Sequence, residues 1–588
     1  MLTISNLNLI YHTIKPLKIK QIYSYVTHIL KASIFNKYIS NRVGKKRYQA
    51  KPTVFQLIEK PYVDYHHDLA NNTFVFLYKM VNFEEKIEWN KTDLEKLWLY
   101  NLHYFDYLIQ LAGNINEDNF ILGERIITDW MENNPIGHGN GWEPYPISIR
   151  IVNWIFFFQF YRNDFKINPQ FEKIFLDSLY HQCHYLTYFI EHHLQANHLF
   201  KNAKALYIAG MFFDNCKWLE NGIALLEREI SEQILSDGGH FERSPMYHAI
   251  ILEDILDLVN FSKTIDSDNT NLEISVLLLK VNQMYSWLAS VVHPDGEIPL
   301  FGDSALNAAL KLPQLKGYIG NLCGPFIITN EILKSGALES SGYFTFEAAE
   351  QFLIIDGGEL GVVYQPGHSH CDLLSYEYSY LDCRFIVDTG IGNYQVSELR
   401  QKARSIYAHN TVVVNNMDQA EIWHAFRMAR RIKPEKIDYF ANPEEIRFEG
   451  YYINELINKK SYMHKRIVIL RNRRFFYIED HIEAGLIKSV ESLVHIHPAA
   501  NIKVNDNLIT ISRDDRIIVL LYKSLETKIE IREWFYVPEF GRVFKSKVVA
   551  FLPKVENNPI LSYIICPLSH VEQAREYYYE KTTNDEPI

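Results

Sequence analysis

Residues 246–261 read MYHAIILEDILDLVNF, and their apolar side chains recur three and four residues apart. This spacing places them on one broad face of an α-helix. The same pattern recurs in residues 93–111, 171–193 and 201–213, and short loops rich in Gly, Pro and Asn separate the segments. From about residue 92 to 333 the sequence therefore predicts layered helices, as in an α/α toroid (an incomplete barrel) whose loops gather at one end.

After about Gly342 the pattern changes to short segments rich in Val, Ile, Tyr and Phe, with turns between them. The segments are residues 352–356, 361–364, 374–387, 410–414, 467–480 and 502–511. They predict a large antiparallel β-sandwich. The expected organisation is α+β and multidomain: a basic segment at 1–55, the toroid at 56–340 and the sandwich at 341–588.

Composition fits a globular protein of several domains, with 47% hydrophobic and 22% charged residues in a chain of 588. No apolar run reaches the length of about 18 residues that a transmembrane helix needs. The six cysteines are scattered without a CxxC pair, so we expect free thiols. The net charge of −11 excludes a uniformly basic surface, and we expect no nucleic-acid partner.

The N-terminal segment departs from this composition. Residues 1–51 contain ten Lys or Arg, and the first acidic residue is Glu59. Clustered positive charge suits an anionic membrane or an anionic polymer, and a solvated pair of basic helices fits equally well. No apolar segment followed by small residues indicates a signal peptide. We expect a cytoplasmic location, with peripheral contact at the inner face of the membrane as one option and the periplasm as the alternative.

Two polar loops precede helices. Asn197 and His198 stand just before a predicted helix, where unpaired N–H groups favour an anionic group. Residues 237–248, DGGHFERSPMYH, crowd ionisable side chains into a Gly-rich loop that leads into the next helix. Each loop also has a purely structural interpretation, with Asn197 and Ser244 as helix caps and Tyr247 packed in the core.

Residues 367–372, GHSHCD, precede a predicted strand and are the most informative motif. In an extended chain His368 and His370 point to the same face. Two imidazoles on one face indicate metal binding or acid–base chemistry, although such pairs also occur without either. Asp388 and His409 lie downstream, and two His with one Asp form a reasonable tetrahedral zinc site with one open position.

These motifs resemble, in order, those of the heparinase II/III-like polysaccharide lyase family. The matching segments are residues 97–107 (LWLYNLHYFDY), 141–146 (GWEPYP), 197–199 (NHL), 237–248, 368–372 and 408–414 (AHNTVVV). The resemblance implies an N-terminal α/α toroid, a C-terminal antiparallel β-sandwich and an active site between them. The implied reaction is β-elimination on a uronate-containing acidic polysaccharide, with an unsaturated product.

Carried over residue by residue, the resemblance implies the catalytic residues Asn197, His198, Tyr247 and His368. Asn197, helped by His198, would neutralise the uronate carboxylate, so that the charge built at C5 spreads into it. Tyr247 would protonate the leaving glycosidic oxygen. His368, or Tyr247 itself, would take the C5 proton.

The residue types themselves suggest binding roles. The expected substrate-binding residues are Trp142, Tyr145, Arg150, Glu242, Arg243 and Arg427. The aromatic residues suit stacking on sugars or filling of the toroid, and the arginines suit carboxylates, sulfates or structural ion pairs. The implied metal ligands are His370, Asp388 and His409. This set favours a structural zinc ion, with calcium as the other option.

Two other function classes stay open. A glycoside hydrolase on the same toroid would use paired carboxylates such as Asp237, Glu242 and Asp303. A non-catalytic or editing protein of surface-polysaccharide assembly is the third class. Ultraviolet absorbance of an unsaturated product distinguishes elimination from hydrolysis. The sequence predicts neither the particular uronate nor the oligomeric state.

Overall fold

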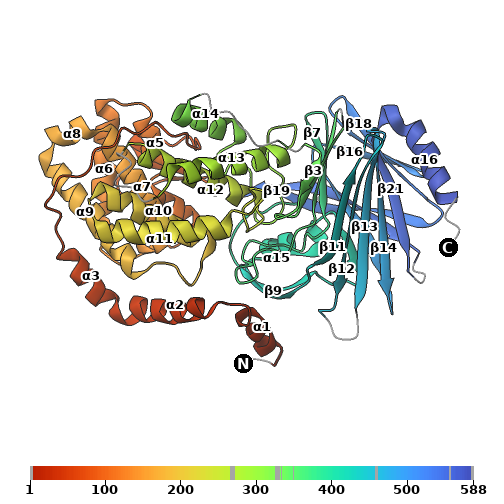
Figure 1. The fold of residues 1–588 in the computed structure, drawn as a ribbon, viewed down its shortest axis with the longest axis horizontal. Coiled ribbons are helices and arrows are strands. Elements are labelled where there is room, and N and C mark those ends of the chain that lie inside the picture. The colour runs from red at the N-terminus through yellow and green to blue at the C-terminus, as the bar shows by residue number, and fades with distance from the viewer. Residues whose placement is uncertain are drawn as a thin grey trace.

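The structure, a computed structural model, describes residues 4–264, 272–324, 332, 334–348, 350–456, 461–554 and 558–583. Helices occupy the first half of the chain and strands the second, and the two halves lie side by side in an elongated molecule (Figure 1). The predicted toroid followed by an antiparallel β-sandwich is confirmed.

The helical domain builds its wall from a series of packed helices. They are α4 (Lys96–Tyr104), α5 (Tyr107–Ala112), α6 (Glu117–Asn133), α7 (Pro144–Phe160), α8 (Arg162–Ile167), α9 (Pro169–Tyr188), α10 (Ala196–Phe212), α11 (Cys216–Gln233), α12 (Pro245–Ser262), α13 (Ile274–Val291) and α14 (Leu312–Cys323). Every residue of α10 except His198 is buried. A helix that is apolar nearly all round belongs in the interior of a helical layer.

The pattern of residues 93–111 predicts one helix, but the structure has two, α4 and α5. Phe105 separates them in the left-handed region, with φ 61° and a fully buried ring. That ring lies 5.5 Å from the rings of Trp89 and Trp154. Burial of the aromatic ring offsets the cost of the left-handed backbone.

The sandwich consists of two antiparallel sheets around a common apolar core. One has the order β11 (Pro434–Ala441), β12 (Glu445–Asn454), β13 (Tyr462–Arg471), β14 (Phe475–Ala484), β21 (Ile560–Pro567), β18 (Arg516–Tyr522), β17 (Leu508–Arg513) and β16 (Asn501–Asn505). The other has β19 (Thr527–Glu539), β20 (Arg542–Pro553), β15 (Val490–Ile496), β7 (Cys383–Ile386), β6 (Tyr376–Tyr380), β5 (Gln351–Asp356), β4 (Tyr343–Ala348) and β3 (Gly336–Leu338), and β8 (Val412–Val414) pairs with β15.

Smaller elements complete the fold. Two hairpins, β1 (Thr73–Phe76) with β2 (Lys79–Asn82) and β9 (Ala420–His424) with β10 (Arg427–Arg431), stand apart from the sheets. Helix α15 (Glu398–Arg404) precedes β8, and α16 (Val571–Thr583) follows the last strand. The strand predicted at residues 361–364 is wrong, because these residues form a turn.

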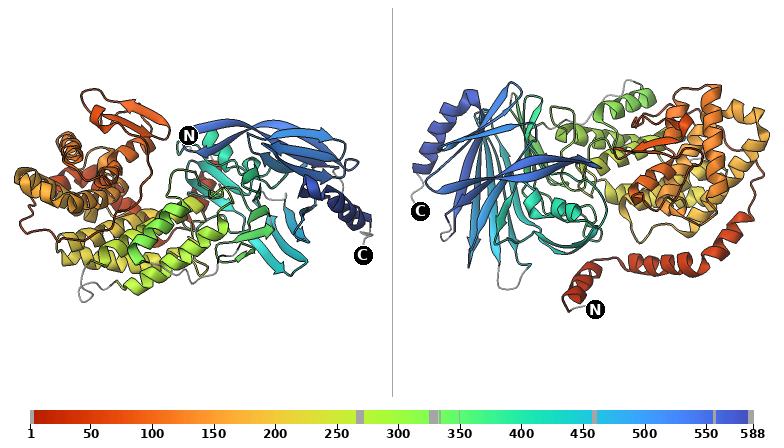
Figure 2. Two further views of the ribbon diagram at one scale, coloured as in Figure 1. Left: turned by 90° about the horizontal axis from the view of Figure 1, so that it is seen from above. Right: turned by 180° about the vertical axis from the view of Figure 1, so that it is seen from behind.

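The basic N-terminal segment forms α1 (Ile4–Ile14), α2 (Ile19–Leu30), a π-helical turn (Lys31–Phe35) and α3 (Asn36–Gly44). Together they run along the outside of both domains (Figures 1 and 2). Helix α3 packs against α9, and α1 packs against β10. Among the described helices, none combines the length and apolar character needed to cross a bilayer.

A buried ion pair connects β13 and β14 inside the sandwich. Arg466 donates from Nε to Oδ1 of Asp480 at 2.8 Å and from Nη2 to Oδ2 at 2.9 Å. His464 contacts the same carboxylate at 2.9 Å. Burial alone would raise the pKa of Asp480, but Arg466 and His464 hold it well below its usual value.

We predict that Asp480→Asn lowers the free energy of unfolding by about 3–5 kcal/mol at neutral pH, because Arg466 keeps a buried charge without its partner. A carboxyl with a depressed pKa stabilises the fold above its unfolded pKa of about 4, and that contribution disappears as the pH falls. The difference between wild type and variant in urea denaturation should therefore shrink in acid.

Asp515→Asn is the matched control, since the Asp515 side chain is 87% exposed beside Arg516. It should change stability by less than about 0.5 kcal/mol. Equal effects of the two substitutions would contradict the importance of the buried pair.

Candidate active site

The predicted catalytic residues converge where the loops of the helical domain meet those of the sandwich. Asn197 lies in the first turn of α10 and Tyr247 in the first turn of α12. Ser244 caps α12 by accepting from the Tyr247 N–H at 3.3 Å, and Pro245 begins the helix, as the sequence predicts. His368 comes from the loop before β6.

A continuous series of contacts joins three of these residues through Glu242. The Asn197 backbone N–H and its Nδ2 donate to Oε1 of Glu242 at 3.0 and 2.9 Å. Oε2 of Glu242 lies 3.6 Å from Nε2 of His368. The His368 ring lies 4.1 Å, centroid to centroid, from the Tyr247 ring. The structure thus brings the amide, the imidazole and the phenol into one cluster.

Glu242 is held as a carboxylate at the start of α10. Burial opposes its charge, but His368, His240 and the donors of Asn197 lower its pKa below the usual value. The N-terminus of a helix also favours a negative charge, because its unpaired N–H groups point towards it. Glu242, predicted to bind substrate, therefore already occupies the anion site at this helix start.

Asp303 orients the two histidines of the HxH motif. Its Oδ2 accepts from Nδ1 of His368 and its Oδ1 from Nε2 of His370, both at 2.8 Å. Arg400 donates to both oxygens, with 2.8 Å between Nη2 and Oδ2. Burial would raise the pKa of Asp303, yet Arg400 and the two histidines hold it well below its usual value. In the neutral ring, Nδ1 of His368 donates its proton to this carboxylate, which leaves Nε2, facing Oε2 of Glu242, as the basic nitrogen.

Tyr247 keeps its proton at neutral pH. Burial, followed by the nearby Tyr394, Tyr145 and Asp303, raises its pKa well above the usual value. Its hydroxyl lies 2.9 Å from the hydroxyl of Tyr394. Such a phenol is suited to donating a proton rather than to acting as a phenolate base.

His198 is the single residue of α10 that is not buried, and it faces Tyr145 at 4.5 Å between ring centroids. Nδ1 of His198 lies 3.1 Å from Oε1 of Glu191. Burial would lower the pKa of His198, but Glu191 outweighs this and raises it. The contact with Glu191 therefore favours the protonated form of His198.

Tyr145 also lines a cavity of about 150 Å³ in the helical domain. Three lysines line it, but acidic groups pair with all of them. Lys201 and Lys204 reach Asp254 at 2.7 and 2.5 Å, and Lys60 reaches Glu253 at 2.8 Å. This cavity is polar but carries little unpaired positive charge.

Two predicted substrate-binding residues are in fact structural. Arg150 is fully buried and donates to Oε1 of Gln182 and to the carbonyls of His103 and Gly141 at 2.8–3.2 Å. Burial lowers its pKa to about 9. Trp142 is buried as well, with its ring 5.9 Å from that of Trp130. Both side chains build the toroid wall, Trp142 from the 3-10 turn Asn140–Trp142 and Arg150 from helix α7.

The remaining binding residues differ in exposure. Arg243 connects the domains, since its Nε donates to the carbonyl of Ser341 at 3.0 Å. Arg427 is exposed at the start of β10. The neighbouring Phe426 borders the site, with its ring 6.0 Å from His368. Of the predicted arginines, Arg427 alone has its side chain free to meet a ligand in the described structure.

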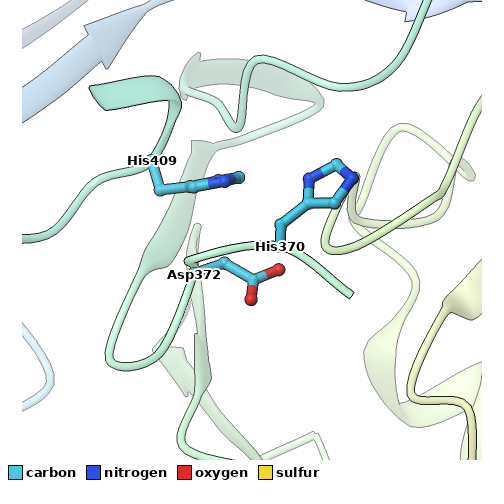
Figure 3. A group of neighbouring side chains, drawn as sticks. All are labelled: His370, Asp372 and His409. Carbon is cyan, nitrogen blue, oxygen red and sulfur yellow. The ribbon is translucent and has the colours of Figure 1, made fainter. Parts of the chain in front are cut away.

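A second group of side chains lies behind His368 and is suited to a metal ion. His370, Asp372 and His409 have ligand atoms within 4.8 Å of one another (Figure 3). Nδ1 of His370 and Nε2 of His409 are buried and have no hydrogen-bond partner in the described residues. Two unpartnered buried imidazole nitrogens beside a carboxylate fit a divalent ion such as zinc.

Asp388 takes a different place from the one predicted. Its Oδ2 lies 2.7 Å from Nδ1 of His409, on the ring atom opposite the unpartnered nitrogen. Asp372 occupies the third position of the group instead. In this geometry Asp388 would orient His409 towards a bound ion, as carboxylates behind metal-binding histidines commonly do.

Sequence reasoning missed Tyr394, Arg400 and the orienting role of Asp303. Tyr394 and Arg400 come from a loop and a helix that carry none of the recognised motifs. Asp303 was considered only as a hydrolytic acid. Its proximity to His368 depends on a tertiary contact, in which the Asp303 N–H donates to the His368 carbonyl at 2.9 Å. No local sequence signal predicts such a contact.

This toroid-and-sandwich architecture, with an Asn, Tyr and His cluster at the junction, defines the class of protein. The model described as Heparinase II/III N-terminus matches residues 4–320. The model described as Heparinase II/III-like, C-terminal, matches residues 333–577. The chain belongs to the heparinase II/III family, as its motifs predict.

Curated relatives agree. A heparin-sulfate lyase from Pedobacter heparinus is 26% identical over 320 residues, which are 50% of this chain and 47% of that protein. The alignment thus spans about half the length of that relative. A heparin-sulfate lyase from Bacteroides stercoris is 24% identical over 582 residues, covering 86% of this chain and 81% of that one.

Solved structures share the fold. A heparinase III structure superposes with a TM-score of 0.69 at 16% identity, over 95% of this chain and 93% of that one. A heparan sulfate lyase from Pedobacter heparinus gives 0.57 at 19% identity, over 91% and 88%. At these identities the likeness shows the architecture alone.

We predict that Arg150→Met lowers the free energy of unfolding by about 1–3 kcal/mol, because it leaves buried acceptors without their donor. It should leave KM for a glycan substrate unchanged. Arg427→Met is the matched control at an exposed position and should alter stability by less than about 0.5 kcal/mol. A raised KM with unchanged stability in the Arg150 variant would contradict its structural role.

Proposed function

We propose that this protein is a polysaccharide lyase that cleaves a uronate-containing acidic polysaccharide by β-elimination. The observation that carries the proposal is the contact series from Asn197 through Glu242 and His368 to Tyr247. It assembles an amide donor, a base and a phenolic acid at one point. The relatives named as heparin-sulfate lyases support the reaction class.

Neutralisation of the substrate carboxylate comes first. A proton beside a carboxylate is a weak acid, because its removal adds a second negative charge to an existing anion. Asn197 Nδ2 has two N–H donors and uses one on Glu242. The second N–H, together with the positively biased His198, would hold the uronate carboxylate and stabilise the enolate-like charge.

His368 is the base that the geometry favours. Asp303 fixes its Nδ1, so the lone pair of Nε2 points towards the cluster. The base removes the C5 proton, and the electron pair of the C5–H bond becomes the C4–C5 double bond as the glycosidic C4–O bond breaks. A positioned imidazole of this kind accelerates proton transfer by about 10²–10⁴-fold.

Tyr247 supplies the proton for the leaving oxygen. Its raised pKa keeps the phenol protonated, which suits an acid and disfavours its use as the base. Tyr394 lies within hydrogen-bond distance of its hydroxyl and would orient it. The residues thus divide the work, with the imidazole taking a proton and the phenol giving one.

Hydrolysis is less well supported, because the candidate carboxylates are engaged elsewhere. Oδ2 of Asp237 accepts from the N–H of Ser341 at 2.7 Å. Asp303 serves two histidines and Arg400, and Glu242 holds Asn197. A glycosidase needs one acid free to protonate the leaving group and a second carboxylate opposite it.

The substrate class that we propose is a glycosaminoglycan or a related uronate polymer. The names of the relatives support heparan-type chains. The exposed Phe426 borders the site, and its neighbour Arg427 would contact a chain that extends beyond the cleaved bond.

We predict that Tyr247→Phe lowers kcat by about 10²–10⁴-fold while the protein stays folded, because the ring remains and only the acid is lost. The measurement is ultraviolet absorbance of unsaturated product from a panel of acidic polysaccharides. Tyr380→Phe is the control, since this hydroxyl contacts only the exposed Glu350 among the described hydrogen bonds. Unchanged release of unsaturated product by the Tyr247 variant would refute the proposed acid.

We further propose a structural divalent ion, preferably zinc, held by His370, His409 and Asp372, with Asp388 behind His409. When bound, the ion would join the loop that carries His368 to the segment before β8. Calcium fits less well, because it prefers a shell of oxygen ligands. Proton transfer would remain with His368 and Tyr247.

Removal of the ion tests its role. We expect purified protein to contain about one zinc per chain by elemental analysis, and His409→Ala to lose it. Chelation should lower the melting temperature and leave the initial rate of still-folded protein largely unchanged. Immediate loss of turnover in folded protein would contradict a purely structural ion.

A further inference from the structure

Helix α2 presents its apolar side chains to solvent and its polar side chains to the protein. Ile19 is 85% exposed and Tyr23 is 70% exposed, whereas Gln21 between them is 2% exposed. Nε2 of Gln21 lies 3.4 Å from the carbonyls of His193 and Tyr364. This is the reverse of an ordinary surface helix, whose apolar stripe faces the core.

The exposed apolar surface continues along the whole N-terminal segment. Of the 39 large hydrophobic residues that are exposed in the described structure, 13 fall between Leu7 and Tyr38. They are Leu7, Tyr11, Ile14, Ile19, Ile22, Tyr23, Tyr25, Val26, Ile29, Leu30, Ile34, Phe35 and Tyr38. Apolar residues concentrated in this way mark an interaction surface rather than ordinary solvent exposure.

The same segment is strongly basic. No acidic residue occurs before Glu59. Its exposed cations are Lys15, Lys18, Lys20, Lys37, Arg42, Lys45, Lys46, Arg47 and Lys51. Within the described structure, ion pairs join only Lys18 and Arg47 of this set to acidic groups, Glu232 and Asp177. The other cations keep their charge available for an external anion.

We propose that the outer face of α1–α3 docks on an anionic lipid bilayer. Apolar side chains would enter the acyl boundary, tyrosines would lie at headgroup level and lysines would meet anionic headgroups. An acidic polysaccharide would satisfy the cations but would leave the Ile, Val and Leu side chains in water. An anionic bilayer would accommodate both the apolar side chains and the cations of this surface.

The segment can transmit docking to the whole molecule because polar contacts fix its inner face. Nζ of Lys31 donates to the carbonyl of Tyr188 at 2.8 Å, and Nε1 of Trp423 donates to Oγ1 of Thr13 at 3.1 Å. The first contact is to the helical domain and the second is to the β9–β10 hairpin. Both domains are therefore held to the docked helices (Figure 2).

The α1 end adds further positive charge. A cavity of about 380 Å³ lies between α1 and the β10 segment. His12, Lys15, Arg430, Arg431 and Lys433 line it together with Glu359, and Arg430 pairs with Glu421. The net charge of this lining is positive, in keeping with an anionic surface nearby.

The full-length protein is tested by flotation with vesicles. We expect it to float with vesicles of equal parts phosphatidylcholine and phosphatidylglycerol and to remain in solution with phosphatidylcholine alone. Added salt should weaken the binding, because part of the attraction is electrostatic. Failure to float with the anionic vesicles would overturn the proposal.

Substitutions then separate the two components of the surface. The triple variant Ile22→Ser, Tyr23→Ser, Val26→Ser should bind at least about tenfold more weakly, since burying one such side chain already changes partitioning by about tenfold. The matched control Ile167→Ser, Leu525→Ser changes residues that are 83% and 87% exposed elsewhere, and should bind like wild type. Lys37→Gln with Lys45→Gln should cost about fivefold for each lysine.

Alternative occupants give different results. Unchanged vesicle binding by the triple variant would overturn the proposal. So would a concentration-dependent dimer in light scattering that the triple variant abolishes, because a second copy would then cover the face. Release of unsaturated product from a soluble oligosaccharide, measured without vesicles, should be the same in all variants, which separates docking from catalysis.

Discussion

The buried carboxylate of Asp303 is the group on which the site depends. It accepts hydrogen bonds from His368 and His370, and Arg400 donates hydrogen bonds to both of its oxygens. An isolated charge at this depth would be strongly unfavourable, but one cation and two imidazoles stabilise it. Because one carboxylate holds both histidines, the proposed base and the proposed metal ligand have a common orientation. A shift of the Asp303 loop would disturb both at once.

Glu242, on the other side of the cluster, is a second buried carboxylate whose charge is stabilised by its neighbours. The proposed substrate is anionic and calls for positive groups, yet the site contains several carboxylates. Glu242 is neutralised by the first turn of α10, and Glu191 by His198. Nδ1 of His198 faces Glu191, and one N–H of Asn197 is bound to Glu242. The second N–H of Asn197 and the Nε2–H of His198 would therefore be the local donors for a uronate. The acids therefore orient the donors instead of repelling the substrate.

The fold and the convergence of the proposed catalytic residues were predictable from the sequence, but the residues that support them were not. Helical and strand periodicity identify the two domains, and the ordered motifs identify Asn197, Tyr247 and His368. Helix α7 is apolar on nearly all sides, so its sequence pattern does not show that Arg150 points into the toroid wall, and the sequence assigns this residue to substrate binding. Likewise Asp372 lies two residues after His370 and Asp388 lies 21 residues before His409, and only the tertiary path of the loops places Asp372 in the group suited to a metal ion.

Helix α2 shows that burial follows the partner surface and not the helix pattern alone. The groove beneath it offers backbone carbonyls, such as those of His193 and Tyr364, so polar side chains face inward and apolar ones remain outside. Lys18 also lies 3.9 Å above the ring of Tyr364. That tyrosine belongs to the loop that continues into His368. The residue that α2 contacts, Tyr364, therefore lies only four positions before the proposed base, His368.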